Sequence, residues 1–89
     1  MTTTTHTADD ILRTVTGIAA AETGIPEAEL RPELDLRGMA GVDSVRVLRM
    51  VAKIERAYDI ELEDRDVFGL STLNDVVTVV GKTLREAAA

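Results

Sequence analysis

The sequence predicts an all-α fold, a four-helix bundle of three main helices and one short helix with a long first loop. Apolar residues recur at helical spacing in three segments, within residues 7–24, 43–58 and 71–85. The one alternating stretch, residues 59–62, is short, and the chain offers no second strand to pair with it. These observations together favour helices throughout.

The first main helix is bounded by clear start and stop signals. Thr7 is a good N-cap, and Asp10 follows at the spacing of a capping box. Gly24 and then Pro26 are typical of a helix end. Between them runs an apolar stripe of Ile11, Val15, Ile18 and Ala19.

Residues 25–42 form the long first loop. Two prolines and two glycines, at 26, 32, 38 and 41, argue against regular structure. A loop this long in a small domain is either functional or packed down by its own side chains. We expect its apolar residues to anchor it onto the helices: Ile25, Leu30, Leu34, Leu36 and Met39.

The second main helix begins near Asp43–Ser44 and ends near Tyr58. Advancing 100° per residue places its apolar residues on one face. Leu48 falls at the margin of that face. Beside it lie four cations, which we call the basic stripe: Arg46, Arg49, Lys53 and Arg56.

The rest of the chain supplies a connector and two further helices. Residues 59–62 form an extended connector with Ile60 and Leu62 pointing inward, and residues 64–68 form a short helix ending at Gly69. The last helix starts after Ser71 or Thr72, and Asp75 again has capping-box spacing from Thr72. Its apolar stripe is Leu73, Val76, Val77, Val80 and Leu84.

Size and composition limit the function. The chain has 89 residues, so we expect one domain over residues 7–85, with a disordered leader at 1–6 and a frayed tail at 86–89. Such a small domain encloses a deep catalytic pocket only with difficulty, which favours a non-catalytic binding or carrying role. The single histidine provides no serine–histidine–acid set, and the carboxylates at 59–66 lack calcium-loop spacing.

Charge and segment content point to a cytoplasmic protein. The net charge of −6 opposes binding to nucleic acid phosphates and suits docking on positively charged partners. There is no cysteine, no apolar run near the length that crosses a membrane, and no secretory signal pattern at the N-terminus. We therefore expect neither a membrane nor a nucleic acid partner, and a monomer.

Residues 41–45, Gly-Val-Asp-Ser-Val, resemble the signature of the acyl and peptidyl carrier proteins at the start of their second helix. Val45 stands where leucine is commonest in that family. The resemblance continues at residues 54–62 and 70–76, and covers roughly residues 8–85. The Asp-Ser pair alone is a weak signal, because serine is also a preferred N-cap.

This resemblance implies a function. Ser44 would carry a 4'-phosphopantetheine arm transferred from coenzyme A, and Asp43 would assist recognition by the phosphopantetheinyl transferase. The arm would hold an acyl, aminoacyl or peptidyl group as a thioester for loading and synthase enzymes. Partners would dock on the second helix and the preceding loop, at Val45, Arg46, Arg49, Lys53, Arg56 and Met39.

Two departures from the family pattern bear on the partners. Residues 37–42 are longer than usual; we interpret them as a tolerated surface insertion rather than a segment in which Met39 shapes a cavity mouth. The basic stripe is atypical, because fatty-acid carriers have an acidic second helix. It is either a solvated face or a docking surface for a dedicated partner. We therefore expect a specialised pathway, polyketide or nonribosomal peptide.

An acyl chain attached to the arm would need an apolar shelter, and two other functions are compatible with the sequence. We expect an attached chain to shelter among Val47, Val51, Ile54, Leu73, Val76, Val77 and Val80. One rival is an interaction module with the carrier fold and no arm. The other is a small helical nucleic-acid-binding domain that uses the basic stripe.

Overall fold

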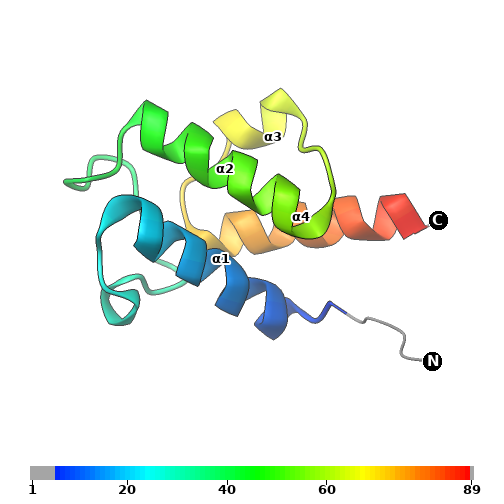
Figure 1. The fold of residues 1–89 in the computed structure, drawn as a ribbon, viewed down its shortest axis with the longest axis horizontal. Helices are drawn as coiled ribbons and strands as arrows, with labels where there is room; N and C mark the ends of the chain where they lie inside the picture. The colour runs from blue at the N-terminus through cyan, green and yellow to red at the C-terminus, as the bar shows by residue number, and fades with distance from the viewer. Residues whose placement is uncertain (1–5, 89) are drawn as a thin grey trace.

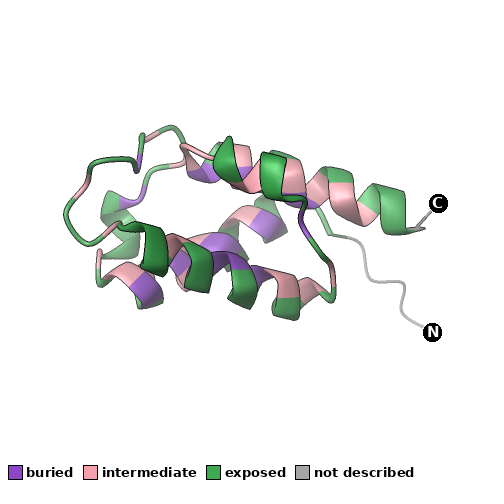
Figure 2. Cartoon of the chain, turned by 90° about the horizontal axis from the view of Figure 1, so that it is seen from above, coloured by how far each residue is buried: buried purple, intermediate pink, exposed green. Residues whose placement is uncertain are grey.

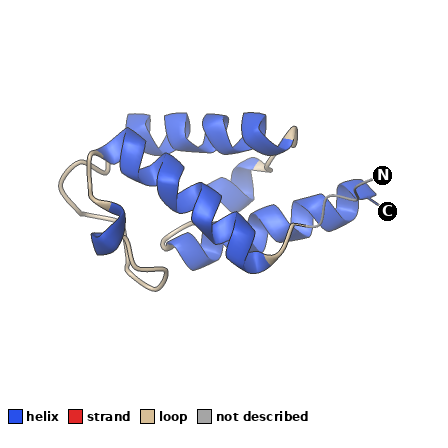
Figure 3. Cartoon of the chain, turned by 60° about the horizontal axis from the view of Figure 1, so that its bottom comes forward, coloured by secondary structure: helices blue, strands red, loops and turns tan. Residues whose placement is uncertain are grey.

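The computed structural model describes residues 6–88 and is helical, with no strand among these residues. The predicted all-α class is therefore confirmed (Figure 3). The elements are α1 (Ala8–Thr23), a 3₁₀ turn η1 (Glu27–Glu29), α2 (Ser44–Tyr58), α3 (Asp64–Phe68) and α4 (Leu73–Ala88).

Helix α1 packs against both α2 and α4, and the long first loop closes one end of the molecule (Figure 1). The start of α2 lies at this loop end, whereas the last turns of α4 lie at the opposite end. Buried residues face inward from each main helix (Figure 2). The largest fully buried core side chains are Ile11, Val15, Ile54, Leu73, Val76 and Val80.

The predicted ends of α1 are confirmed. The Thr7 hydroxyl accepts a hydrogen bond from the Asp10 backbone N–H at 3.1 Å, and Gly24 ends the helix with a left-handed backbone. His6, expected in a mobile leader, lies edge-on to the Tyr58 ring with 5.1 Å between centroids. Residues 1–5 of the expected leader are outside the described residues.

The connector after α2 has the predicted inward side chains. Leu62 is buried and Ile60 is half-buried against the core. Two features that we did not predict hold it there. Asp59 ends α2 with a left-handed backbone, which aspartate tolerates better than most residues, and the Glu55 carboxylate accepts from the Leu62 N–H at 2.8 Å.

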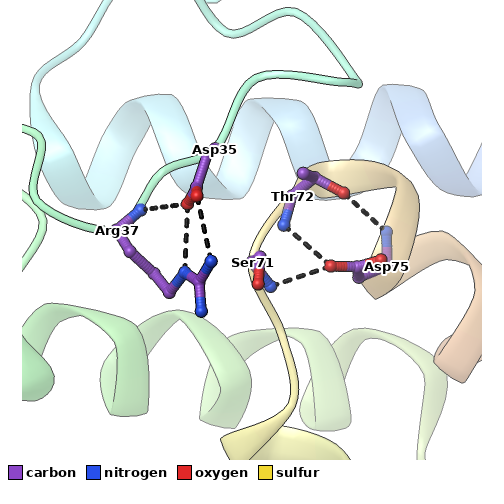
Figure 4. Close-up of polar contacts among 5 residues, drawn as sticks. All are labelled: Asp35, Arg37, Ser71, Thr72 and Asp75. Atoms are coloured by element: carbon purple, nitrogen blue, oxygen red, sulfur yellow. Dashed lines mark hydrogen bonds and ion pairs between the residues drawn. The ribbon is translucent and has the colours of Figure 1, made fainter.

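The long first loop is tied to the start of α4. The Leu36 N–H donates to the Ser71 carbonyl at 2.8 Å, and the Asn74 N–H donates to the Pro32 carbonyl at 3.0 Å. At this point Asp75 forms the predicted capping box. Its carboxylate accepts from the backbone N–H groups of Ser71 and Thr72, as Figure 4 shows.

Helix α4 is longer than predicted. It extends to Ala88, so residues 86–88 are helical rather than the frayed tail that we expected at 86–89. Ala89 is outside the described residues. None of the described helices has the length and apolar character needed to cross a membrane.

Candidate functional site

Ser44 is exposed at the first position of α2. The N-cap of this helix is Asp43, which has an extended backbone and whose carboxylate accepts from the Arg46 N–H at 2.8 Å. The alternative interpretation of Ser44 as the capping residue is therefore wrong. Since no hydrogen bond within residues 6–88 uses the Ser44 hydroxyl, this group is available to an approaching enzyme.

The surroundings of Ser44 fit a phosphate ester. The first turn of α2 has backbone N–H groups without helical partners, and the positive end of the helix dipole favours an anion. The Arg46 guanidinium lies 3.7 Å from the Asp43 carboxylate and is half-exposed. The residues around Ser44 therefore suit a serine-linked phosphate, because the helix start favours an anion and the Arg46 cation belongs to the same turn.

Three hollows border this helix end, and one of them, of about 500 Å³, is mostly polar and lies on the side of Glu22 and Arg49. Of the two with more apolar linings, one is an open groove of about 470 Å³ that runs past Ser44 between α2 and α3. Its lining includes Val42, Val47, Leu48, Phe68 and Leu70.

The other hollow is a small cavity of about 50 Å³ beneath α2, with an almost wholly apolar lining. Of the residues expected to shelter an attached chain, Val47 and Val76 line it. Val51, Ile54, Leu73 and Val80 are buried in the core away from this lining, and Val77 is half-buried. Helix α1 and the loop contribute Ala19, Thr23, Leu30 and Leu36 to the lining.

The loop at residues 37–42 is packed down at two points. Met39 is half-buried against the core, although it does not line the small cavity. Gly41 has φ 87°, and a Cβ there would lie 3.0 Å from the Thr23 carbonyl oxygen. The segment lies on the surface, as expected, and is packed down at Met39 and Gly41.

Three residues of the basic stripe are engaged within the chain, by Glu22 of α1. The Glu22 side chain is only 6% exposed and pairs with Arg49 Nε at 2.8 Å and with Lys53 Nζ. The Arg46 guanidinium donates to the Glu22 backbone carbonyl at 2.8 Å. Chiefly because Lys53 donates a hydrogen bond to it, the Glu22 carboxyl has a pKa below its ordinary value, despite the opposing effect of burial.

Sequence reasoning missed Glu22. Its position continues the apolar stripe of α1, at Ile11, Val15 and Ile18, by one more turn. An acid on a buried face requires a cationic partner, and the basic stripe was the available source. Arg56 does not contact Glu22. The other three cations of the basic stripe are partly neutralised by Glu22, so they would present less positive charge to a docking partner than the sequence suggests.

Comparison with known proteins agrees with this geometry. A family model described as a phosphopantetheine attachment site matches residues 13–80. Among solved structures, the chain is similar to an acyl carrier protein from Enterococcus faecalis, with a TM-score of 0.72 and 21% identity. That match covers 86% of this chain and 98% of the other.

Proposed function

This chain belongs to the family of proteins with a phosphopantetheine attachment site, and we propose that Ser44 is the residue that carries the group. The family is one of carrier proteins with a 4'-phosphopantetheine prosthetic group, and the fold is that of an acyl carrier protein. One observation carries the assignment to Ser44: its hydroxyl is exposed at the start of α2 while Asp43 performs the capping.

The chain's own part in the chemistry is to present the Ser44 hydroxyl to the transferase and to orient the attached group. The Ser44 hydroxyl oxygen would form the new bond to the phosphorus of the phosphopantetheinyl group, and its proton would pass to a base of the transferase. The phosphoanhydride bond of coenzyme A would break in the same step, and adenosine 3',5'-bisphosphate would leave. The first turn of α2 then stabilises the phosphate charge. When bound, the arm supplies a thiol that holds an acyl group as a thioester.

Asp43 has a second proposed role in recognition by the transferase, because its carboxylate is exposed directly before Ser44. The docking face is proposed to include the α2 residues beside it and the preceding loop. Within that face, Val45 is strongly exposed and Arg56 lies outside the Glu22 cluster. Four further residues would contribute to this docking face while keeping their contacts within the chain: Met39, Arg46, Arg49 and Lys53.

We propose that the carried group is short or polar and belongs to a specialised pathway, polyketide or nonribosomal peptide. The cavity of about 50 Å³ supports a short carried group, and the atypical basic stripe on α2 is the reason for proposing a specialised pathway. An apolar cavity that binds benzene has a volume of about 150 Å³. A long acyl chain would therefore require a large rearrangement of α1 and α2, which α1–α2 ion pairing at Glu22 opposes.

The test is the intact mass of the protein after incubation with coenzyme A and a broad-specificity phosphopantetheinyl transferase. We expect a gain of one phosphopantetheinyl group. The chain has two serines, so Ser44→Ala is compared with the matched variant Ser71→Ala. Loading that is lost only in Ser44→Ala supports the proposal. A folded wild type that gains no mass favours the rival interaction module without an arm.

A further inference from the structure

The buried acid Glu22 lies beside the small cavity as well as beside the basic stripe. On α1, the neighbouring residues Ala19 and Thr23 both line that cavity. On α2, Arg46 lines the cavity, and its guanidinium donates to the Glu22 carbonyl oxygen at 2.8 Å. We call the contacts of Glu22 with α2 the Glu22 clamp: the hydrogen bond from Arg46 and the ion pairs with Arg49 and Lys53.

The walls of the cavity other than α2 are held together by backbone contacts. The first loop lies against α1 at Gly41, where a Cβ would lie 3.0 Å from the Thr23 carbonyl oxygen. The loop is joined to the start of α4 by the hydrogen bond from the Leu36 N–H to the Ser71 carbonyl, and both residues line the cavity. By contrast, the clamp holds α2 against α1 through side chains. A larger cavity therefore requires that α2 move away from α1 and break the clamp, or that the backbone contacts break.

The cavity lies directly beside the open groove that contains Ser44. Four residues line both hollows: Arg37, Val42, Val47 and Leu70. A group attached at Ser44 would therefore meet the cavity from the groove side. The groove has a volume of about 470 Å³ and the cavity about 50 Å³, so the cavity is the space that limits how much of the group enters the core.

We propose that Glu22 is a positioning residue for the carried group: the Glu22 clamp keeps an attached chain in the groove and out of the core. This inference rests on the proposed function of Ser44. An apolar cavity that holds benzene measures about 150 Å³, about three times the volume present here. A chain of several methylene groups therefore enters the core only if the clamp is released. Its burial there would then stabilise the folded state.

The experiment compares the acetyl and octanoyl forms of each protein, prepared with the broad-specificity transferase from acetyl-coenzyme A and octanoyl-coenzyme A. The proteins are the wild type, Glu22→Gln, Arg49→Gln and the control Glu33→Gln, which removes the charge of an exposed loop acid. Arg49→Gln removes one ion pair of the clamp by changing a side chain that is about two-thirds exposed, so the core is left unaltered. The reporters are the amide chemical shifts of Ala19 and Val76, which line the cavity but not the groove.

In the wild type and in Glu33→Gln, the Ala19 and Val76 signals should be the same in the two forms. In Glu22→Gln, the octanoyl chain should move both signals. It should also raise the melting temperature above that of the acetyl form by about 4 °C more than in the wild type, as for burial of one or two methylene groups. Because this difference is taken within one protein, the lower stability of the variant does not produce it. Arg49→Gln should respond in the same direction and less strongly.

Two results would overturn the inference. If the octanoyl chain moves the Ala19 and Val76 signals in the wild type, the chain enters the core past an intact clamp. If the signals stay fixed in Glu22→Gln or, where that variant does not fold, in Arg49→Gln, release of the clamp does not admit the chain. A wild type that gains no acyl-phosphopantetheinyl mass, or a Ser44→Ala variant that does gain it, would instead overturn the proposed function.

Discussion

Arg49 Nε lies 2.8 Å from Glu22 Oε1, and this contact joins the face of α2 to the end of α1. The acid is almost fully buried, while the arginine is about two-thirds exposed. Lys53 binds the other carboxylate oxygen, so one acid holds two cations from successive turns of α2. The pairing ties α2 to the end of α1.

Replacement of Glu22 by glutamine should lower the melting temperature clearly at neutral pH. The substitution keeps the side-chain shape but removes the charge that holds Arg49 and Lys53 of α2 against the end of α1, so the ion pairs at this buried acid are lost. The matched control is Glu33→Gln, an exposed acid in the loop, which should change stability little. Equal melting temperatures for the two variants would contradict a structural role for Glu22.

Glu22 should also contribute to the acid sensitivity of the fold. Its pKa is lowered in the folded state, so its stabilisation is fully present above the unfolded-state pKa and is lost as pH falls through the folded-state value. The difference in melting temperature between the wild type and Glu22→Gln should therefore be largest at neutral pH and shrink below about pH 4, near the ordinary glutamate pKa. A difference that stays constant down to pH 2 would refute this assignment.

Gly41→Ala should destabilise the protein more than Gly38→Ala. Both glycines have a positive φ, so each alanine costs about 1–2 kcal/mol in backbone conformation. Only at Gly41 would the new Cβ also meet a backbone oxygen, that of Thr23 at 3.0 Å, whereas Gly38 faces open space. Chemical denaturation of both variants measures the difference. Equal losses would show that the loop shifts away from α1 without cost.

Local features of the fold were predictable because their partners are close in sequence. Thr7 with Asp10, and Thr72 with Asp75, were found from a spacing of three residues, and both pairs form the expected hydrogen bonds. The long-range contacts were not predictable in this way. A helical projection of α2 shows which cations share a face, but it does not show that Glu22 lies opposite them.

The candidate site was predictable only in part for a related reason. Asp43 and Ser44 are both good N-caps, so composition does not decide which one caps α2. The structure assigns the extended backbone to Asp43 and the first helical position to Ser44. Likewise, a periodic stripe of apolar residues predicts which side chains are buried, but it does not predict where their packing leaves a cavity. The cavity formed at the loop end of α2, beside Leu30 and Leu36, rather than along the whole core.

Asp75→Ala should loosen the junction between the first loop and α4. The carboxylate accepts from two backbone N–H groups, at 2.9 Å from Ser71 and 3.0 Å from Thr72. Its loss should cost about 1–2 kcal/mol in the free energy of unfolding. Because the Ser71 carbonyl binds the Leu36 N–H, amide hydrogen exchange should also accelerate at Leu36. Exchange that accelerates only within α4 would contradict this coupling.

Two substitutions at Asp43 separate its capping role from its proposed role in recognition. Asp43→Ala removes the acceptor for the Arg46 N–H and should cost about 1 kcal/mol, which corresponds to a fall of about 4–8 °C in melting temperature. Asp43→Asn keeps a capping oxygen and removes the charge, so its stability should stay close to that of the wild type.

Loading of Ser44 then distinguishes the two roles. If the transferase recognises the carboxylate, Asp43→Asn should load slowly although it is stable, because its helix start is preserved and only the charge is gone. If Asp43 acts only as the cap, Asp43→Asn should load at the wild-type rate and Asp43→Ala should be slower, since fraying of the first turn misplaces the Ser44 hydroxyl. Rates of mass gain for the three proteins at one temperature, below the melting transition of each, decide between them.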